Sequence, residues 1–297
     1  MHSRRQLLGL AALTPALAWA CAQADEIEDT MRRIRPLFTP KQPAQPGDWL
    51  AEHQEPGQSY RDFRKAVSRR AVDSFSHIRI VPIGPLSPGE QSVLDVTIDF
   101  MKPFFGLPLV VDSPVALDSI PEEAQREMFL DAPKQLLTTH LLNHVLMARR
   151  GPADAAVLGI TALDLWPGPG WNYVFGQASL RERVGVWSMA RNGEADGTAE
   201  MRSLCALRTA QTATHETGHM FGIRHCIAYQ CGMNGSNHVE ERDRQPLEFC
   251  AECQGKLWWT LGLDPLARSR ALEATARRHG LERVAEAFAR QSRALDD

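Results

Sequence analysis

Short apolar runs and longer segments of helical periodicity alternate along the central part of the chain. Residues 78–83 are rich in isoleucine and begin with an alternating pattern, which predicts a strand. The apolar runs at 108–111 and 156–161 predict two more strands, the second of them buried. Residues 173–176 and 184–187 have the aromatic and β-branched composition of two further strands.

Helical spacing is clearest in three other segments. Residues 136–149 place apolar side chains three and four positions apart, which predicts an amphipathic helix. Residues 198–221 predict a long helix, and residues 265–295 predict two helices that are broken at Gly280. The pattern of residues 93–105 fits either a strand or a helix.

The first 24 residues have the organisation of an export signal, and we expect residues 1–24 to be removed. Arg4 and Arg5 precede an apolar stretch that is shorter than the ~18 residues of a membrane span. A small-x-small sequence that ends at Ala24 is the expected cleavage site. The paired arginines are typical of a twin-arginine (Tat) signal, with a Sec signal or a lipid anchor at Cys21 as alternatives. The chain is therefore expected to be exported, to the periplasm or outside the cell.

The remainder of the chain divides into three parts. Residues 25–76 are mixed in character and rich in proline at 40–46, and we expect an arm that wraps the domain. A short helix is expected within it near residues 60–72. Residues 77–264 form the expected main domain, and residues 265–297 form the C-terminal helices.

Composition excludes several classes of protein. Hydrophobic residues make up 43% of the 297 residues, which is enough for a packed core and too much for a disordered chain. The formal net charge of −3 leaves no basic excess, so we expect no nucleic-acid partner. No internal apolar run reaches the ~18 residues of a membrane span.

One histidine motif carries most of the chemical information. His215 and His219 are four residues apart on a predicted helix, so both imidazoles lie on one face and can bind one zinc ion. Gly222 suits a left-handed turn that returns His225 as a third ligand. Three histidines leave one coordination position for water, as in a catalytic zinc site, and Glu216 is placed beside it. The added glycine and third histidine make the pattern far more specific than the first histidine pair alone.

The cysteines form a second constellation. Cys226 directly follows the third histidine, Cys231 lies five residues on, and Cys250 and Cys253 form a C-x-x-C pair. Four thiolates in two close pairs are the ligand set of a closed, structural zinc site. Disulfides are the main alternative in an exported protein. We expect Cys205 to be a buried free thiol on the long helix.

The combined motifs resemble the archaemetzincins, a metzincin-type family of zinc peptidases. The resemblance rests on His-Glu-x-x-His-x-x-Gly-x-x-His-Cys, a second cysteine, Met233 and the C-x-x-C pair, in that order. It extends to residues 48–63, 172–179 and 232–246, and it is strongest over 156–257.

This resemblance implies the fold and the cofactors. The implied fold class is α/β (α+β-like), a single compact metzincin-type domain with a twisted mixed sheet, an active-site helix and C-terminal helices. The family implies one catalytic and one structural zinc ion, two Zn²⁺ per chain. Met233 is expected in a turn that packs beneath the catalytic zinc without binding it, although a methionine alone is commonly a plain core residue.

The expected function is that of a zinc metallopeptidase, which hydrolyses a peptide or protein substrate with a zinc-bound water. Zinc lowers the pKa of this water and polarises the scissile carbonyl, and Glu216 acts as the general base. Residues 184–187 are a candidate edge strand for an extended peptide, or else an ordinary core strand. Residues 165–170 and the arm are candidates for shaping the cleft, and we expect a monomer.

Two other functions remain open. One is a zinc-binding scaffold with little turnover, and the other is a redox protein that uses Cys250 and Cys253. Retention of Glu216 favours the peptidase, because a scaffold does not need it. His140 and His144 are also four residues apart, but no third ligand accompanies them, so we expect a structural role.

The leader also gives a testable prediction. Cys226, Cys231, Cys250 and Cys253 bind zinc only as thiolates, so we expect the chain to fold and bind zinc before export. Replacing Arg4 and Arg5 with lysine should leave a zinc-loaded precursor in the cytoplasm, as measured by fractionation and metal analysis. Export of this variant at the normal rate would exclude the Tat route.

Overall fold

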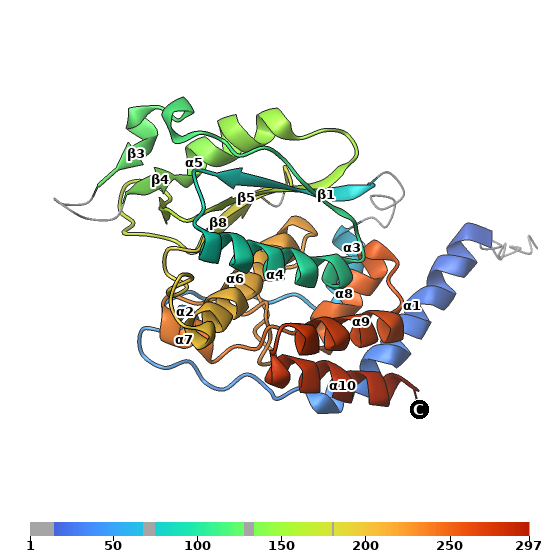
Figure 1. Cartoon of the computed structure of the whole chain (residues 1–297). Helices are drawn as coiled ribbons and strands as arrows, with labels where there is room; N and C mark the ends of the chain where they lie inside the picture. Colours follow the sequence, from blue (N-terminus) through green and yellow to red (C-terminus); the bar gives the residue numbers. More distant parts are fainter. Residues whose placement is uncertain (1–14, 68–74, 128–133, 180, 297) are drawn as a thin grey trace, which may run out of the picture.

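A mixed five-stranded sheet forms the centre of the upper half of the molecule in Figure 1. The computed structural model describes residues 15–67, 75–127, 134–179 and 181–296. The strand order of the five-stranded sheet is β2-β1-β5-β8-β7, with β7 antiparallel to its neighbour and the other pairings parallel. The strands are β1 (His77–Ile83), β2 (Leu109–Val111), β5 (Asp154–Thr161), β7 (Gly176–Ser179) and β8 (Val184–Ser188).

Both faces of this sheet are covered, which explains the apolar runs in its strands. Ile78 and Ile80 belong to the core that the sheet shares with α4 (Pro88–Phe105) and α6 (Ala199–Met220). Val81 and Ile83 point to the other face and pack against the helical segment 138–149. Successive side chains of a strand point to opposite faces, so β1 contributes to both cores.

The structure confirms most of the predicted strands. Segments 78–83, 108–111 and 156–161 are strands, but the prediction of a strand at 173–176 is wrong. The chain there first bridges to Leu165 through Val174, so β7 begins only at Gly176.

Of the two alternatives for residues 184–187, the structure shows the core strand, and the edge position is wrong. Strand β8 lies between β5 and β7, and all of its residues are buried. Burial on both faces and pairing on both sides explain the apolar sequence of β8. The antiparallel strand β7, with its partly exposed residues, occupies the edge instead.

The segment 93–105 is helical, because a strong start signal precedes it. Ser87 accepts a hydrogen bond from the backbone N–H of Glu90, and the Glu90 carboxylate accepts one from the backbone of Ser87. This capping box begins α4, and Gly106 ends it in a left-handed conformation with a φ of 63°. Helix α4 then packs against α6, the helix that carries the histidine motif.

Helix α1 (Pro15–Ile34) packs on α8 (Ala251–Leu261) and α10 (Glu282–Asp296). A Cβ atom at Gly255 would lie 2.3 Å from Sδ of Met31, so glycine permits this close approach. Helix α1 runs through the predicted cleavage site at Ala24, whose side chain is buried. Residues 1–14 lie outside the described residues, and the export signal remains a prediction.

The arm continues along the domain after α1. Pro40 forms an antiparallel bridge with Tyr229, beside the histidine and cysteine motifs. Two short helices follow, α2 (Trp49–Glu52) and α3 (Tyr60–Ala66). The described part of α3 is shorter than the predicted helix at 60–72, and residues 68–74 are not described.

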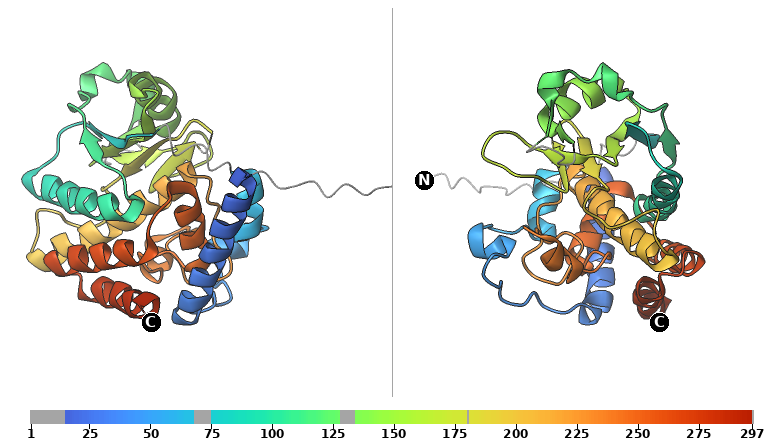
Figure 2. Two further views of the ribbon diagram at one scale, coloured as in Figure 1. Left: turned by 90° about the vertical axis from the view of Figure 1, so that its right-hand side faces the viewer. Right: turned by 60° about the vertical axis from the view of Figure 1, so that its left-hand side comes forward.

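The C-terminal residues form the two predicted helices, α9 (Pro265–Arg278) and α10, with Gly280 between them at a φ of 68°. Figure 2 places α10 at the end of the molecule opposite the segment 138–149. In the described part of the chain, no helix combines the length and apolar character needed to span a membrane. The remaining elements are short: η1 (Arg35–Leu37), η3 (Leu117–Ser119), η4 (Glu122–Ala124), β3 (Gln125–Arg126), β4 (Gln135–Leu137), α5 (Thr138–His140), η5 (Leu141–Leu146), η6 (Met147–Arg149), β6 (Asp164–Trp166) and α7 (Val239–Asp243).

Candidate metal centre and active site

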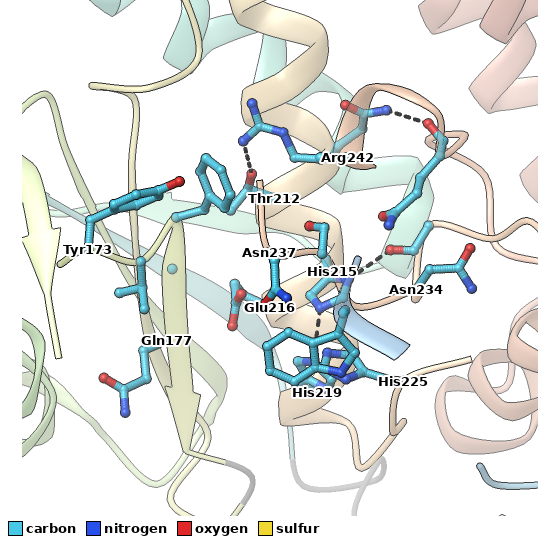
Figure 3. Close-up of a pocket in the computed structure, with 18 of the residues that line it drawn as sticks. Tyr173, Gln177, Thr212, His215, Glu216, His219, His225, Asn234, Asn237 and Arg242 are labelled. Atoms are coloured by element: carbon cyan, nitrogen blue, oxygen red, sulfur yellow. Dashed lines mark hydrogen bonds between the residues drawn. The ribbon is translucent and has the colours of Figure 1, made fainter. Parts of the chain in front are cut away.

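Three histidines meet at the C-terminal end of α6, as shown in Figure 3. His215 and His219 lie on one face of the helix, and their Nε2 atoms are 3.0 Å apart. Gly222 adopts a φ of 86°, a left-handed conformation that turns the chain back toward the helix. His225 then completes the group, in which one nitrogen of each ring lies within 4.8 Å of the others.

Each imidazole hydrogen-bonds an acceptor through its outer nitrogen. Nδ1 of His215 lies 2.8 Å from the carbonyl oxygen of Gly232, and Nδ1 of His219 lies 2.7 Å from that of Ile223. Nδ1 of His225 lies 2.7 Å from a carboxylate oxygen of Glu55. Carbonyl and carboxylate oxygens only accept, so Nδ1 carries the proton in each neutral ring. The ring nitrogens that face one another, Nε2 in His215 and His219, are therefore left without a proton.

Burial keeps the helical pair neutral. Burial and the neighbouring imidazoles lower the pKa of His219 to about 4 and lower that of His215 well below its ordinary value. Neutral imidazole is the form that binds a metal ion, and here the neutral form prevails at pH 7.

Glu216 lies between the two helical histidines in sequence and lines the same cleft. Its side chain is only 9% exposed, and burial raises its pKa to about 8. A Cβ atom at Gly176 would lie 3.0 Å from Cγ of Glu216, so the edge strand β7 begins directly against this carboxyl group. The candidate general base thus lies at the junction of α6 and the edge strand.

Met233 is fully buried against the histidine helix. A Cβ atom at Gly218 would lie 2.6 Å from Sδ of Met233, so the thioether packs on α6 at the residue that precedes His219. The carbonyl oxygen of Met233 accepts a hydrogen bond from the backbone N–H of Cys226, at 2.7 Å. Met233 therefore links the helix to the residue that follows His225.

The four cysteines of the second motif form a buried cluster. The four Sγ atoms lie within 4.8 Å of one another, and they belong to Cys226, Cys231, Cys250 and Cys253. Cys226 is 7% exposed and the other three are 0% exposed. All four are free thiols in this structure, as is the buried Cys205, which confirms the prediction for that residue.

The sequence interpretation missed Asn234, which holds the loop between the two clusters. Its Nδ2 donates to the carbonyl oxygens of Cys226 and Tyr229, at 2.6 and 2.9 Å. Its Oδ1 accepts from the backbone N–H of Cys231, at 3.0 Å. An asparagine in a turn is a general turn signal, so its role here could not be read from sequence.

The sequence also gave no sign that Glu55 of the arm contacts His225. Burial alone would raise the pKa of Glu55, but hydrogen bonds from His225 and Trp49 outweigh it and hold the pKa below its usual value. The Glu55 carboxylate is therefore ionised, and it lies 3.0 Å from Nε1 of Trp49.

A cleft of about 480 Å³ opens in front of the histidines. Residues 173–177 form one wall, and residues from Gly232 to Pro246 form the other, with α6 between them (Figure 3). Pro167 and Trp49 also line it, so the loop after β6 and the arm both shape the cleft as expected. Arg242 lies in the second wall with its guanidinium 4.3 Å from the ring centre of Phe175.

Neither the His140–His144 pair nor His238 joins the histidine cluster. His140 and His144 stack with ring centres 5.0 Å apart, and no third candidate ligand joins them among the described residues. His238 caps α7 through a hydrogen bond from the backbone N–H of Glu241. Asp48 and Glu241 lie close to His238, but both carboxylates already accept backbone hydrogen bonds.

The raised pKa of Glu216 predicts how the metal-free protein responds to pH. Because the pKa is raised, the folded protein binds the carboxyl proton more tightly than the unfolded chain does. The resulting stabilisation of the folded state is fully present below the usual pKa of 4.5, and it is lost as pH rises through about 8. We expect metal-free Glu216→Gln to melt at a higher temperature than the metal-free parent at about pH 8.5, with little difference near pH 5. Thermal unfolding followed by circular dichroism measures the melting temperature of each protein at each pH. Parallel pH profiles for the two proteins would contradict the burial of an ionisable Glu216.

Comparison with known proteins agrees with this geometry. The sequence profile of Peptidase family M54 matches residues 90–258. Archaemetzincin-2 of Rattus norvegicus is 33% identical over 275 residues, which cover 80% of this chain and 74% of that protein. Archaemetzincin of Pyrococcus furiosus is 31% identical over 186 residues, which cover 62% of this chain and 94% of that protein. The crystal structure of archaemetzincin from Methanopyrus kandleri superposes with a TM-score of 0.50 at 30% identity, covering 63% of this chain and 97% of the other. The chain therefore belongs to peptidase family M54, the archaemetzincins, and its histidine and cysteine clusters are the candidate zinc sites of a metallopeptidase.

Proposed function

We propose that His215, His219 and His225 hold a catalytic zinc ion and that Glu216 is the general base of peptide hydrolysis. The observation that carries this proposal is the orientation of the three rings. Each Nδ1 atom has its own acceptor, and one nitrogen of each ring lies within 4.8 Å of the others. Neutral nitrogen ligands with their outer N–H groups hydrogen-bonded are the donor set that zinc prefers.

The four-cysteine cluster suits a second, structural zinc ion. Four sulfur ligands leave no open position for water or substrate, unlike the three histidines. The backbone N–H groups of Cys250 and Met233 point to Sγ of Cys231, at 3.1 and 3.4 Å. Such hydrogen bonds stabilise a thiolate, which is the form that binds zinc. A total of two zinc ions per chain follows from these donor sets.

Glu216 supplies the proton transfers of the reaction. A bound zinc ion supplies Lewis-acid activation of water and of the scissile carbonyl group. The Glu216 carboxylate accepts the proton of the attacking water at one of its oxygens and returns it to the nitrogen of the leaving amine. Its burial beside β7 keeps bulk water from competing for that proton.

The substrate on this proposal is an extended peptide that lies along β7. The strand pairs with β8 on one side, and among the described residues no strand pairs with its other edge. Gly176 and Gln177 of β7 line the cleft, so a peptide added at that edge passes in front of Glu216.

Two observations weigh against the rival functions. A redox role needs accessible thiols, and Cys250 and Cys253 are fully buried. A scaffold without turnover does not need a carboxyl group beside the three histidines, and Glu216 lines the cleft there. Hydrolysis therefore has the better support.

Removing the base gives the most direct test of the catalytic role. Glu216→Gln keeps the size of the side chain and the three histidines but removes the proton acceptor. We expect kcat to fall by about 10³-fold with the zinc content unchanged. Peptide cleavage and metal analysis measure the two effects, and Glu286→Gln on the exposed face of α10 is the matched control. Activity within a few-fold of the parent at equal zinc content would exclude Glu216 as the base.

The two proposed zinc ions should differ in how tightly they are held. Three histidines in an open cleft exchange zinc more readily than four buried thiolates. Mild chelation should therefore remove one ion and abolish activity while the circular dichroism spectrum persists. Recovering a single zinc ion together with disulfide-bonded cysteines from the native protein would refute this assignment.

A further inference from the structure

The arm between residues 48 and 60 lies against the turn that brings His225 back to the helix. Gln58 contacts this turn twice. Its Nε2 donates to the carbonyl oxygen of Gly222, at 3.2 Å, and its Oε1 accepts from the backbone N–H of Arg224, at 3.1 Å. The side chain therefore fixes both ends of the left-handed turn.

Glu55 contacts the imidazole of His225 itself. Its Oε1 lies 2.7 Å from Nδ1 of His225, whereas the other two histidines are held by carbonyl groups of nearby loops. A carboxylate forms a stronger hydrogen bond than a carbonyl group, and it fixes both the tautomer and the orientation of the ring. His225 needs this support most, because it lies on a turn and not on α6.

Trp49 connects the arm to the cleft wall formed by residues 232–246. Its ring centre lies 5.2 Å from that of His225, and its Nε1 donates to Glu55. A Cβ atom at Gly235 would lie 2.6 Å from Cδ1 of Trp49, so the indole packs directly on the segment after Met233. The backbone N–H of Trp49 donates to the buried carboxylate of Glu241, at 3.0 Å.

The same stretch of arm is anchored on the helix that carries the C-x-x-C pair. The buried Lys256 of α8 donates from Nζ to the carbonyl oxygen of Gln58, at 2.6 Å. Glu252 of α8 accepts a hydrogen bond from the backbone N–H of Tyr60, at 3.0 Å. The arm is thus fixed at both ends, at Trp49 and at Gln58 to Tyr60, with Glu55 between them.

We propose that this stretch of the arm is a working part of the active site. Glu55 is a positioning residue that holds the His225 ring ready for zinc, and Trp49 is the aromatic wall against which the peptide substrate lies. The inference rests on the proposed zinc-binding role of the three histidines. It adds a contribution from outside residues 90–258, the part of the chain that the family profile matches.

Metal affinity tests the role of Glu55 independently of turnover. We expect Glu55→Ala to weaken the more loosely held zinc ion by about 10- to 100-fold, as measured by competition with a chromophoric chelator. It should also change the visible spectrum of the protein with cobalt(II) in the histidine site. Glu55→Gln keeps an oxygen that accepts the Nδ1 proton, so it should restore most of the affinity.

Glu28→Ala is the matched control for this experiment. Glu28 is another arm carboxylate, which pairs with Arg61 and Arg64 of α3 and forms no ion pair with a histidine among the described residues. Its removal should leave zinc affinity within about twofold of the parent. If Glu55→Ala binds zinc as tightly as Glu28→Ala, with an unchanged cobalt spectrum, the positioning role is wrong. A parent protein that holds no metal at the histidines would instead refute the proposed function itself.

Trp49 has a different expected effect. Trp49→Ala should raise KM for a peptide substrate by roughly tenfold, because an aromatic contact with the substrate is lost. Its zinc affinity should change much less than that of Glu55→Ala. An unchanged KM would remove Trp49 from the substrate-binding wall. Circular dichroism of each variant checks that it is folded. If Glu55→Ala is not folded, Glu55→Leu takes its place, because leucine keeps much of the bulk of the side chain but offers no acceptor for the Nδ1 proton.

Discussion

Three imidazole nitrogens can approach one another in a protein only if the proton of each ring is held elsewhere. Here the three Nδ1 atoms reach Gly232, Ile223 and Glu55, which lie in three different segments of the chain. Much of the surrounding structure serves to place these acceptors. Gly222 provides the turn, Gly218 lets Met233 pack against α6, and the arm supplies the carboxylate. Removing any one of the three acceptors would leave a ring without a fixed tautomer.

The cysteine cluster is physically coupled to the histidine cluster. Cys226 follows His225 directly, and its backbone is held by Met233 and Asn234. Helix α8 carries Cys253 and also anchors the arm through Lys256. A structural metal among the thiols would therefore set the position of the third histidine from both sides. This coupling gives a physical reason for the closeness in sequence of the two candidate zinc sites.

The sequence predicted the parts of the structure that depend on local patterns. The histidine helix, the turn at Gly222 and the break at Gly280 all follow from residue spacing and glycine conformation. The two errors both concerned sheet pairing. Strand β8 has an apolar sequence because it is buried between β5 and β7, and no local signal distinguishes this from an edge. Glu55 was missed because a contact across 170 residues leaves no spacing pattern.

Anomalous X-ray scattering at the zinc absorption edge, from crystals of protein purified without chelators, tests the central claim most directly. The account predicts one peak among the Nε2 atoms of His215, His219 and His225, with Glu55 on the outer side of His225. It predicts a second peak among the sulfur atoms of Cys226, Cys231, Cys250 and Cys253. A protein with zinc at the cysteines and no metal at the histidines, or with the cysteines paired as disulfides, would contradict it.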